Sequence, residues 1–256
     1  MTARLERARN LYMRGIRDGD ISVVAEHTGD VYIQHSAGVA DGVEGFTRFF
    51  EEFLERNPDR EIDLVRSFED ANGVFVHAHQ ILNGGHVQWV TMDWFRFDDD
   101  DKIIEHWDVI APYSAKNPSG RSSVDGQTEV TDEGQGSANA ELVAEAIRNL
   151  LMAGGDREAG LDVISDDYIQ HNAEVGDGRS AFAEKVRAEN SPLVYQQIHR
   201  ICANGDFVAV LSEATFDGRP YAQGDLFRVE KGLIAEHWDV AEAIAPEEEW
   251  ANTGKF

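Results

Sequence analysis

The chain has 256 residues, of which 42% are hydrophobic, and its 48 acidic and 23 basic side chains give a net charge of −25. This length suits one large domain or two small ones with buried cores, so a wholly disordered chain is excluded. An acidic surface repels phosphate groups, so we expect no nucleic-acid partner and no binding to anionic membranes.

The predicted elements run helices first and strands after, and this order then repeats. Leu5, Ala8, Tyr12 and Ile16 mark a first amphipathic helix. Segregated helices and consecutive strands indicate an α+β fold with an antiparallel meander. In the first half, a further helix is predicted from Gly42 to Pro58, and strands at 61–69, 73–82, 86–97 and 102–110. In the second half, helices are predicted near 138–153 and 178–190, and strands near 194–203, 206–215, 219–229 and 232–241.

Short motifs confirm that the chain contains a tandem repeat. The run from Tyr32 to His35 recurs from Tyr168 to His171, and Glu105-His106-Trp107-Asp108-Val109 recurs letter for letter from Glu236 to Val240. The Ser- and Gly-rich stretch between the copies has the composition of a linker. We therefore predict two domains at 1–115 and 137–246, a flexible linker at 116–136 and a C-terminal tail at 247–256.

The last two strands of each repeat are predicted to place an aspartate opposite a histidine. With a turn from Asp98 to Asp101, Asp93 faces His106. With the three-residue loop Glu230-Lys231-Gly232, Asp225 faces His237. Both turns preserve the same pairing.

Strand alternation sorts the side chains of this hairpin onto two faces. An imidazole beside a carboxylate in apolar surroundings can serve as general acid and general base, because burial and neighbouring charge tune both groups. The same pair can equally be a structural ion pair, and duplication does not decide between the two. One face is predicted to carry Asp93, Phe95, Ile104, His106 and Asp108, and the other Trp94, Arg96, Glu105 and Trp107.

Other polar residues are less informative. His35 and His171 each end a short strand, where a histidine can line a pocket or cap the strand. No metal site is expected, because His106 and Asp108 offer only two ligands and His77 and His79 become Ala209 and Leu211 in the second copy. The single cysteine, Cys202, excludes an internal disulfide framework.

The localisation prediction follows from what the chain lacks. No apolar run reaches the roughly 20 residues of a membrane helix, and the first residues lack the apolar stretch of a signal peptide. We expect a soluble, cytoplasmic protein.

Taken together, the Tyr-Ile-Gln-His, Asp-x-Phe-Arg and Ile-x-Glu-His-Trp-Asp-Val motifs resemble the SnoaL-like proteins, named for a polyketide cyclase. The resemblance implies two tandem nuclear-transport-factor-2-like cone barrels, each with helices packed in a curved antiparallel sheet. It also implies cofactor-free acid–base chemistry on a small carbonyl compound, by aldol cyclisation or isomerisation. The catalytic candidates are Asp93, His106, Asp225 and His237, and the substrate-binding candidates are His35, Phe95, Asp108, His171, Phe227 and Asp239.

Two alternatives stay open: a non-catalytic ligand-binding or scaffold protein, and a hydrolase or dehydratase that activates water with the same pair. The family often forms homodimers, so we expect the two repeats to pack as an intrachain pseudo-dimer through the Trp94/Trp107 face and its counterpart, Leu226/Trp238, with further homo-oligomers open. The charge is spread over both repeats and the chain has only 5 Lys, a composition typical of proteins from high-salt habitats.

Overall fold

The computed structural model describes residues 1–132, 134–188 and 192–256, which divide into two compact units. Unit 1 consists of Met1–Pro112 together with Ile244–Phe256, and unit 2 of Tyr113–Ala243. Unit 2 therefore includes the segment at 116–136 predicted as a linker, and unit 1 includes the predicted tail. How the two repeats pack on each other stays a prediction.

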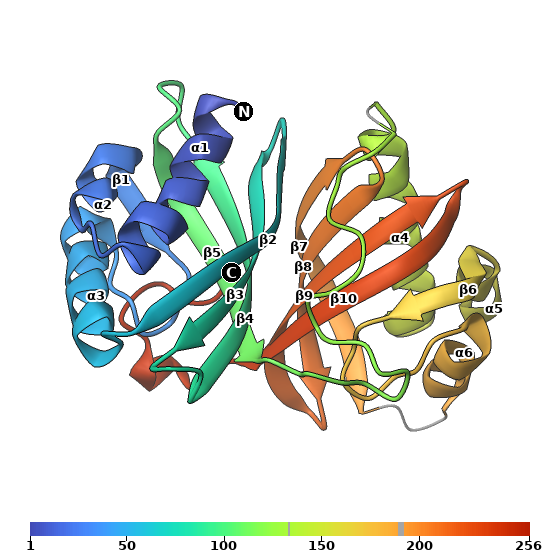
Figure 1. Cartoon of the computed structure of the whole chain (residues 1–256). Helices are drawn as coiled ribbons and strands as arrows, with labels where there is room; N and C mark the ends of the chain where they lie inside the picture. Colours follow the sequence, from blue (N-terminus) through green and yellow to red (C-terminus); the bar gives the residue numbers. More distant parts are fainter. Residues whose placement is uncertain (133, 189–191) are drawn as a thin grey trace. The chain divides into compact units, whose positions relative to one another are not determined.

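Unit 1 has the predicted order of helices and strands (Figure 1). The short strand that ends before His35, β1, completes it: this strand lies at one edge of the sheet and pairs in parallel with β5. Among the described residues the sheet has five strands in the order β1-β5-β4-β3-β2. The elements are α1 (Ala3–Asn10), the π-helical η1 (Leu11–Arg17), α2 (Ser22–His27), β1 (Thr28–Gln34), α3 (Gly42–Arg56), β2 (Arg60–Asp70), β3 (Gly73–Leu82), β4 (Val87–Phe97), β5 (Ile103–Pro112) and the short η2 (Glu247–Glu249).

Unit 2 repeats this architecture, with the described strands ordered β6-β10-β9-β8-β7. The α+β prediction is confirmed, although residues 189 and 190 of the helix predicted at 178–190 lie outside the described residues. The elements are α4 (Gly136–Leu151), α5 (Arg157–Asp162), β6 (Ile164–Gln170), α6 (Arg179–Arg187), β7 (Leu193–Asn204), β8 (Phe207–Phe216), β9 (Arg219–Glu230) and β10 (Leu233–Ala243).

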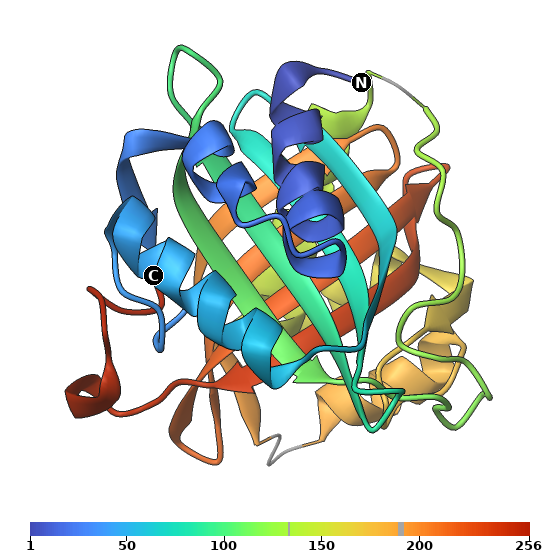
Figure 2. The ribbon, with the colours of Figure 1, turned by 60° about the vertical axis from the view of Figure 1, so that its left-hand side comes forward.

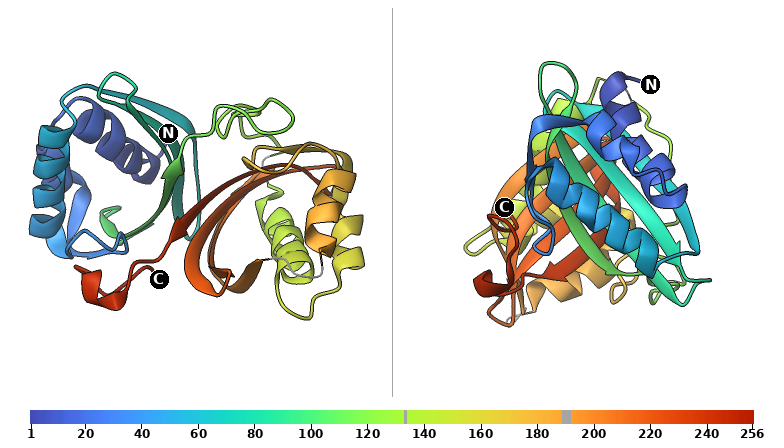
Figure 3. Two further views of the ribbon diagram at one scale, coloured as in Figure 1. Left: turned by 90° about the horizontal axis from the view of Figure 1, so that it is seen from below. Right: turned by 90° about the vertical axis from the view of Figure 1, so that its left-hand side faces the viewer.

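The helices of each unit lie on one face of its own sheet, and the core forms between them (Figures 2 and 3). In unit 1, alternate residues of β3, namely Val74, Val76 and Ala78, are fully buried in this core. They meet Phe46 and Phe50, which are four residues apart and therefore on the same face of α3. The hydrophobic core of unit 1 therefore lies between α3 and this face of the sheet.

The repeated Asp-Gly pair joins the first strand of each unit to the helix that follows. Asp41 Oδ1 accepts a hydrogen bond from the backbone N–H of Gln34 at 2.8 Å, and Asp177 does the same for Gln170 at 3.0 Å. Gly42 and Gly178 have φ angles of 83° and 94°, which only glycine adopts at little cost. The motif therefore holds the end of β1 and β6 in place, beside the last strand.

The predicted hairpin registers are wrong by two residues. Asp93 lies opposite Asp108, and Asp225 lies opposite Asp239, rather than opposite the histidines. Each turn is one residue shorter than predicted: Asp98 N–H bonds to Lys102 O across a three-residue loop, while Lys231 and Gly232, with φ of 53° and 76°, form a two-residue turn of type I′.

A β-bulge accounts for the other residue of the shift. Arg96 pairs with Glu105 but Phe97 pairs with Ile103, so Ile104 is left unpaired, and Ala235 is skipped in the same way. The bulge turns Ile103 into the core, where it is fully buried, so the predicted inward position of Ile104 is also wrong. Because the two displacements add to an even number, every later side chain keeps its predicted face.

Candidate functional site

Unit 1 contains a cavity of about 290 Å³ between its helices and its sheet. Its wall on α3 is aromatic, and η1 and the strand ends add further apolar side chains. Polar groups enter it from the sheet, chiefly on β4 and β5. This is an apolar pocket with a few convergent polar groups, the usual form of a small-molecule site. The aromatic wall is Phe46, Phe49, Phe50 and Phe53, and the polar side is Tyr12, Gln80, Thr91, Asp93, His106 and Asp108.

An aspartate and a histidine are in direct contact at this polar side. Asp93 Oδ1 lies 2.8 Å from His106 Nε2, and in unit 2 Asp225 Oδ1 lies 3.0 Å from His237 Nε2. They are diagonal rather than opposite neighbours across β4 and β5, which the bulged register still brings within reach. Asp93 is 2% exposed and His106 7% exposed, so bulk water does not separate them.

A glutamine from the first strand orients each histidine. Gln34 Oε1 accepts hydrogen bonds from the backbone N–H groups of His35 and Ser36, which identifies it as the oxygen. It lies 3.0 Å from His106 Nδ1, and since a carbonyl oxygen only accepts, Nδ1 carries a proton. The proton between Nε2 and Asp93 is then the one that can move. Gln170 holds His237 Nδ1 in the same way, at 2.9 Å.

A tyrosine donates to the aspartate in each unit, but from a different element. The Tyr12 hydroxyl, on η1, donates to Asp93 Oδ2 at 2.6 Å, whereas the Tyr195 hydroxyl, on β7, donates to Asp225 at 3.0 Å. Burial, and then the neighbouring carboxylate, raises the pKa of both phenols well above the usual value. Both hydroxyls therefore stay protonated and act as donors.

The second aspartate of each unit has different partners in the two units. In unit 1, Lys255 Nζ donates to Asp108 Oδ1 at 3.0 Å. Burial alone would raise the pKa of Asp108, but the Lys255 ammonium and the His106 imidazole outweigh it and lower the pKa. In unit 2, Asp239 accepts instead from the neutral amides of Asn172 and Gln223. Burial raises the pKa of Asp239, and the nearby Asp225 adds to the shift.

The phenylalanines predicted to bind substrate pack on the histidines. The Phe95 ring stacks on His106 with centroids 4.6 Å apart and lines the cavity, and Phe227 stacks on His237 at the same distance. Asp93, Phe95, His106 and Asp108 thus come together as predicted around one cavity. Asp225, Phe227, His237 and Asp239 form the corresponding group in unit 2.

His35 and His171 do not join these groups. His35 stacks on Trp107, and its Nε2 lies 3.0 Å from Glu105, so it lies with the outward-facing side chains of β5 and is not among the residues that line the cavity. His171 stacks on Trp238 and contacts Glu236 at 2.9 Å in the same manner. Alternation along β5 and β10 explains this, since Glu and Trp point away from the core there.

Among the described residues, no cluster of three or more His, Cys, Asp or Glu side chains is arranged to hold a metal ion. In the same part of the chain, no helix is long and apolar enough to cross a membrane.

The sequence matches the model of the SnoaL-like domain family twice, over residues 9–106 and 143–237. The chain belongs to the SnoaL-like family. No curated protein matches it.

Solved structures with a similar fold each match a little less than half of this SnoaL-like chain. A candidate ketosteroid isomerase from Kribbella flavida is 18% identical, with 44% of this chain and 84% of that one covered and a TM-score of 0.39. An NTF2-like protein of unknown function from Cytophaga hutchinsonii is 17% identical, with 46% and 95% covered and a TM-score of 0.36. A candidate polyketide cyclase from Acidithiobacillus ferrooxidans is 18% identical, with 41% and 89% covered and a TM-score of 0.35. The strand orders of the two units and the two matches to the SnoaL-like family confirm the predicted tandem α+β repeat.

Sequence reasoning missed several residues of the SnoaL-like site. Gln34 and Gln170 could have been found, because both lie in the repeated Tyr-Ile-Gln-His motif. Tyr12 and Tyr195 could not have been found from the repeat, since they occupy unrelated positions in its two copies. Lys255 carried no signal, because it lies far from the motifs in a segment predicted to be a tail.

Proposed function

We propose that unit 1 catalyses acid–base chemistry at the carbon beside a carbonyl group of a small, apolar compound, as an aldol cyclase or an isomerase. The observation that supports this most directly is the placement of the Asp93–His106 pair at the wall of an apolar, largely aromatic cavity. Phenylalanine side chains favour a flat, hydrophobic ligand, and a cavity near 290 Å³ is at the small end of ligand pockets.

The proposed reaction needs only proton transfers. Asp93 removes a proton from the carbon beside the carbonyl, so a C–H bond breaks, an O–H bond forms, and the electron pair moves onto the carbonyl oxygen as an enolate. In an isomerisation the enolate takes the proton back at another carbon. In a cyclisation its carbon attacks a second carbonyl of the same molecule, and the new alkoxide takes the proton.

His106 and Tyr12 have distinct roles in this scheme. His106, held by Gln34 with Nδ1 protonated, exchanges the mobile proton with Asp93 through Nε2. Tyr12 donates to the other carboxylate oxygen and stabilises the negative charge that Asp93 carries before the first transfer and after the second. The direct 2.8 Å contact leaves no place for a water between Asp93 and His106, which favours enolate chemistry over the water-activating alternative.

Exchange of carbon-bound protons for deuterium tests the proposal without knowledge of the natural substrate. A compact bicyclic ketone, 2-tetralone, is incubated with the protein in D₂O, and the loss of its α-proton signals is followed by NMR. We expect exchange faster than buffer alone, with a loss of about 10²-fold or more in Asp93→Asn. Exchange that is equally fast with Asp93→Asn would contradict the assignment of the base. The matched control is Asp225→Asn, which changes the same group in unit 2.

A non-catalytic binding role is supported by a different observation. The Asp–His–Gln chain has the same geometry in both units, and the polar atoms named above already have partners within the protein. A saturated network of this kind also stabilises a core. In that case neither the unmodified protein nor the double variant Asp93→Asn/Asp225→Asn exchanges the protons of 2-tetralone faster than buffer. The double variant still binds 2-tetralone but is less stable than the unmodified protein.

We further propose that the acidic composition is an adaptation to high salt. The chain carries 48 Asp and Glu against 5 Lys, and dense carboxylates repel one another unless salt screens them.

A further inference from the structure

The segment at 244–256 is anchored to unit 1 by a set of backbone-directed hydrogen bonds. His35 Nδ1 donates to Gly254 O at 2.7 Å, and the Asn252 amide donates to Ser36 O and Val39 O at 2.6 and 2.9 Å. The Ala251 N–H adds a bond to Ala37 O. His35, which lies outside the cavity, therefore has a partner that explains its place: it holds this segment.

The anchored segment carries a lysine to the candidate site. Lys255 Nζ donates to Asp108 Oδ1 at 3.0 Å, and the two side chains are 3% and 8% exposed. Asp108 lines the cavity and lies directly opposite Asp93 on the neighbouring strand. A buried ammonium is thus placed beside one of two facing carboxylates.

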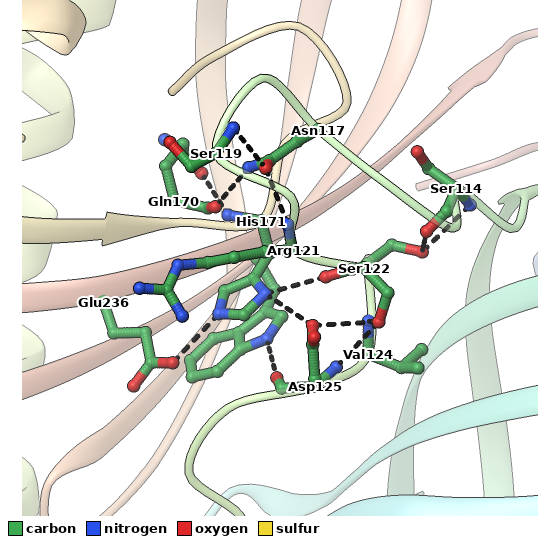
Figure 4. Close-up of polar contacts among 12 residues, drawn as sticks. Ser114, Asn117, Ser119, Arg121, Ser122, Val124, Asp125, Gln170, His171 and Glu236 are labelled. Carbon is green, nitrogen blue, oxygen red and sulfur yellow. Dashed lines mark hydrogen bonds and ion pairs between the residues drawn. The ribbon is translucent and has the colours of Figure 1, made fainter. Parts of the chain in front are cut away.

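Unit 2 has an equivalent anchor without the equivalent charge (Figure 4). His171 Nδ1 donates to Ser122 O at 2.7 Å, and the Asn117 amide donates to Gln170 O and Val175 O. Of the two basic residues of this segment, Lys116 is exposed and Arg121 pairs with Asp177 rather than with Asp239. Within the described residues, the anchored segment therefore brings a lysine to the inner aspartate in unit 1, whereas in unit 2 neutral amides contact that aspartate.

We propose that Lys255 is a positioning residue of the unit 1 site, which supplies the positive charge that keeps Asp108 ionised directly opposite Asp93. Two carboxylates on opposed strand positions repel each other and otherwise share a proton. With Lys255 in place, Asp108 has its own counter-charge and Asp93 has His106. Unit 2 has neutral amides at this point, so Asp239 should titrate at a higher pH than Asp108. The titratable and charged groups that face Asp108 are Lys255 from the anchored segment, His106 on β5, Asp93 on β4, Tyr12 on η1 and Tyr32 on β1.

This inference rests on the proposed function, because it concerns the charge of Asp108 in that site. Its test does not require that the protein catalyse a reaction. The opposite pKa directions of Asp108 and Asp239 agree with it. If Asp108 behaves as expected and no exchange of 2-tetralone is found, the proposed reaction fails while the role of Lys255 survives.

The test is a pH titration of the aspartate side-chain carboxyls by ¹³C NMR on the full chain, with signals assigned from Asp108→Asn and Asp239→Asn. In the unmodified protein we expect Asp108 to titrate at lower pH than Asp239. In Lys255→Met the Asp108 midpoint should rise by about one pH unit or more, which is a tenfold or larger change in proton affinity. Lys255→Arg should keep the low midpoint, and Arg121→Met should leave it unchanged.

Two results would overturn the proposal. One is a Lys255→Met protein that is less stable but has an unmoved Asp108 midpoint, because Lys255 would then only anchor the segment. The other is a single shared midpoint for Asp108 and Asp239 in the unmodified protein, which decides the question even if Lys255→Met does not fold.

Discussion

Asp93 on β4 lies directly opposite Asp108 on β5, so two buried carboxylates face each other across neighbouring strands at the wall of the cavity. Like charges so placed are unfavourable unless each has a counter-charge or they share a proton. His106 contacts the first and Lys255 the second. The pair Asp225 and Asp239 is arranged alike in unit 2 but has no lysine among the partners described above. Several measurable differences between the two units follow.

Replacement of the second aspartate should affect the two units in opposite ways. Asp108→Asn removes one partner of a buried ion pair with Lys255, so we expect a loss of about 3–5 kcal/mol in the free energy of unfolding at pH 7. Asp239→Asn removes a carboxyl group whose ionised form is disfavoured by burial, so stability should be unchanged or higher. Urea unfolding followed by tryptophan fluorescence measures the free energy of unfolding of each variant. Equal losses in Asp108→Asn and Asp239→Asn would contradict the expected difference between the two units.

The same two residues should give opposite pH dependences. The pKa of Asp108 is lowered by folding, so its contribution to stability is present above the unfolded value near 3.9 and is lost as the pH falls. The pKa of Asp239 is raised, so its contribution is present below that value and is lost as the pH rises. Unfolding curves from about pH 2 to 7 should therefore show the penalty of Asp108→Asn shrinking below the unfolded value and the benefit of Asp239→Asn growing above it. Parallel curves would argue against both assignments.

Removal of the tyrosine hydroxyl should separate catalysis from stability. Tyr12→Phe deletes the donor to Asp93 Oδ2, and a hydrogen bond to a charged group contributes about 1.5–3 kcal/mol, so exchange of 2-tetralone protons should fall by roughly 10- to 100-fold. Tyr195→Phe deletes the corresponding donor to Asp225 and should lose a similar amount of stability while exchange continues. An equal loss of exchange in both variants would mean that catalysis is not confined to unit 1.

Salt should stabilise the protein. Self-repulsion of a chain with a net charge of −25 is screened as the Debye length falls from about 10 Å at 0.1 M to about 3 Å at 1 M salt. We expect the melting temperature to rise over this range of NaCl, as followed by circular dichroism. A melting temperature that does not change with NaCl would remove the proposal of a high-salt habitat.

The repeat and the order of its elements could be predicted from the sequence because the signals are local. Motif identity, apolar spacing and turn residues are read over short stretches of chain. The hairpin register could not be predicted from the sequence, since nothing in the residues around Ile104 and Ala235 marks a bulge. The error of two residues was harmless because side chains alternate, so Asp93 and His106 still meet, as diagonal neighbours.

The rest of the site depends on contacts between distant parts of the chain. Tyr12 reaches Asp93 across 81 positions, and Lys255 reaches Asp108 across 147. The partners of His35 and His171 could not be predicted, because a histidine at a strand end gives no indication of which segment packs on it. The Ser- and Gly-rich composition of residues 116–136 likewise predicts a linker, and it does not indicate that Asn117 makes specific hydrogen bonds.

The way the segment 244–256 completes unit 1 has a consequence for biosynthesis. Unit 2 is one uninterrupted stretch, Tyr113–Ala243, whereas unit 1 is closed by residues that follow it. The ribosome therefore finishes every part of the second repeat before it adds the lysine that the first repeat requires. A premature stop within codons 244–254 would leave every residue of unit 2 in place and remove from unit 1 the residues that contact His35 and Asp108.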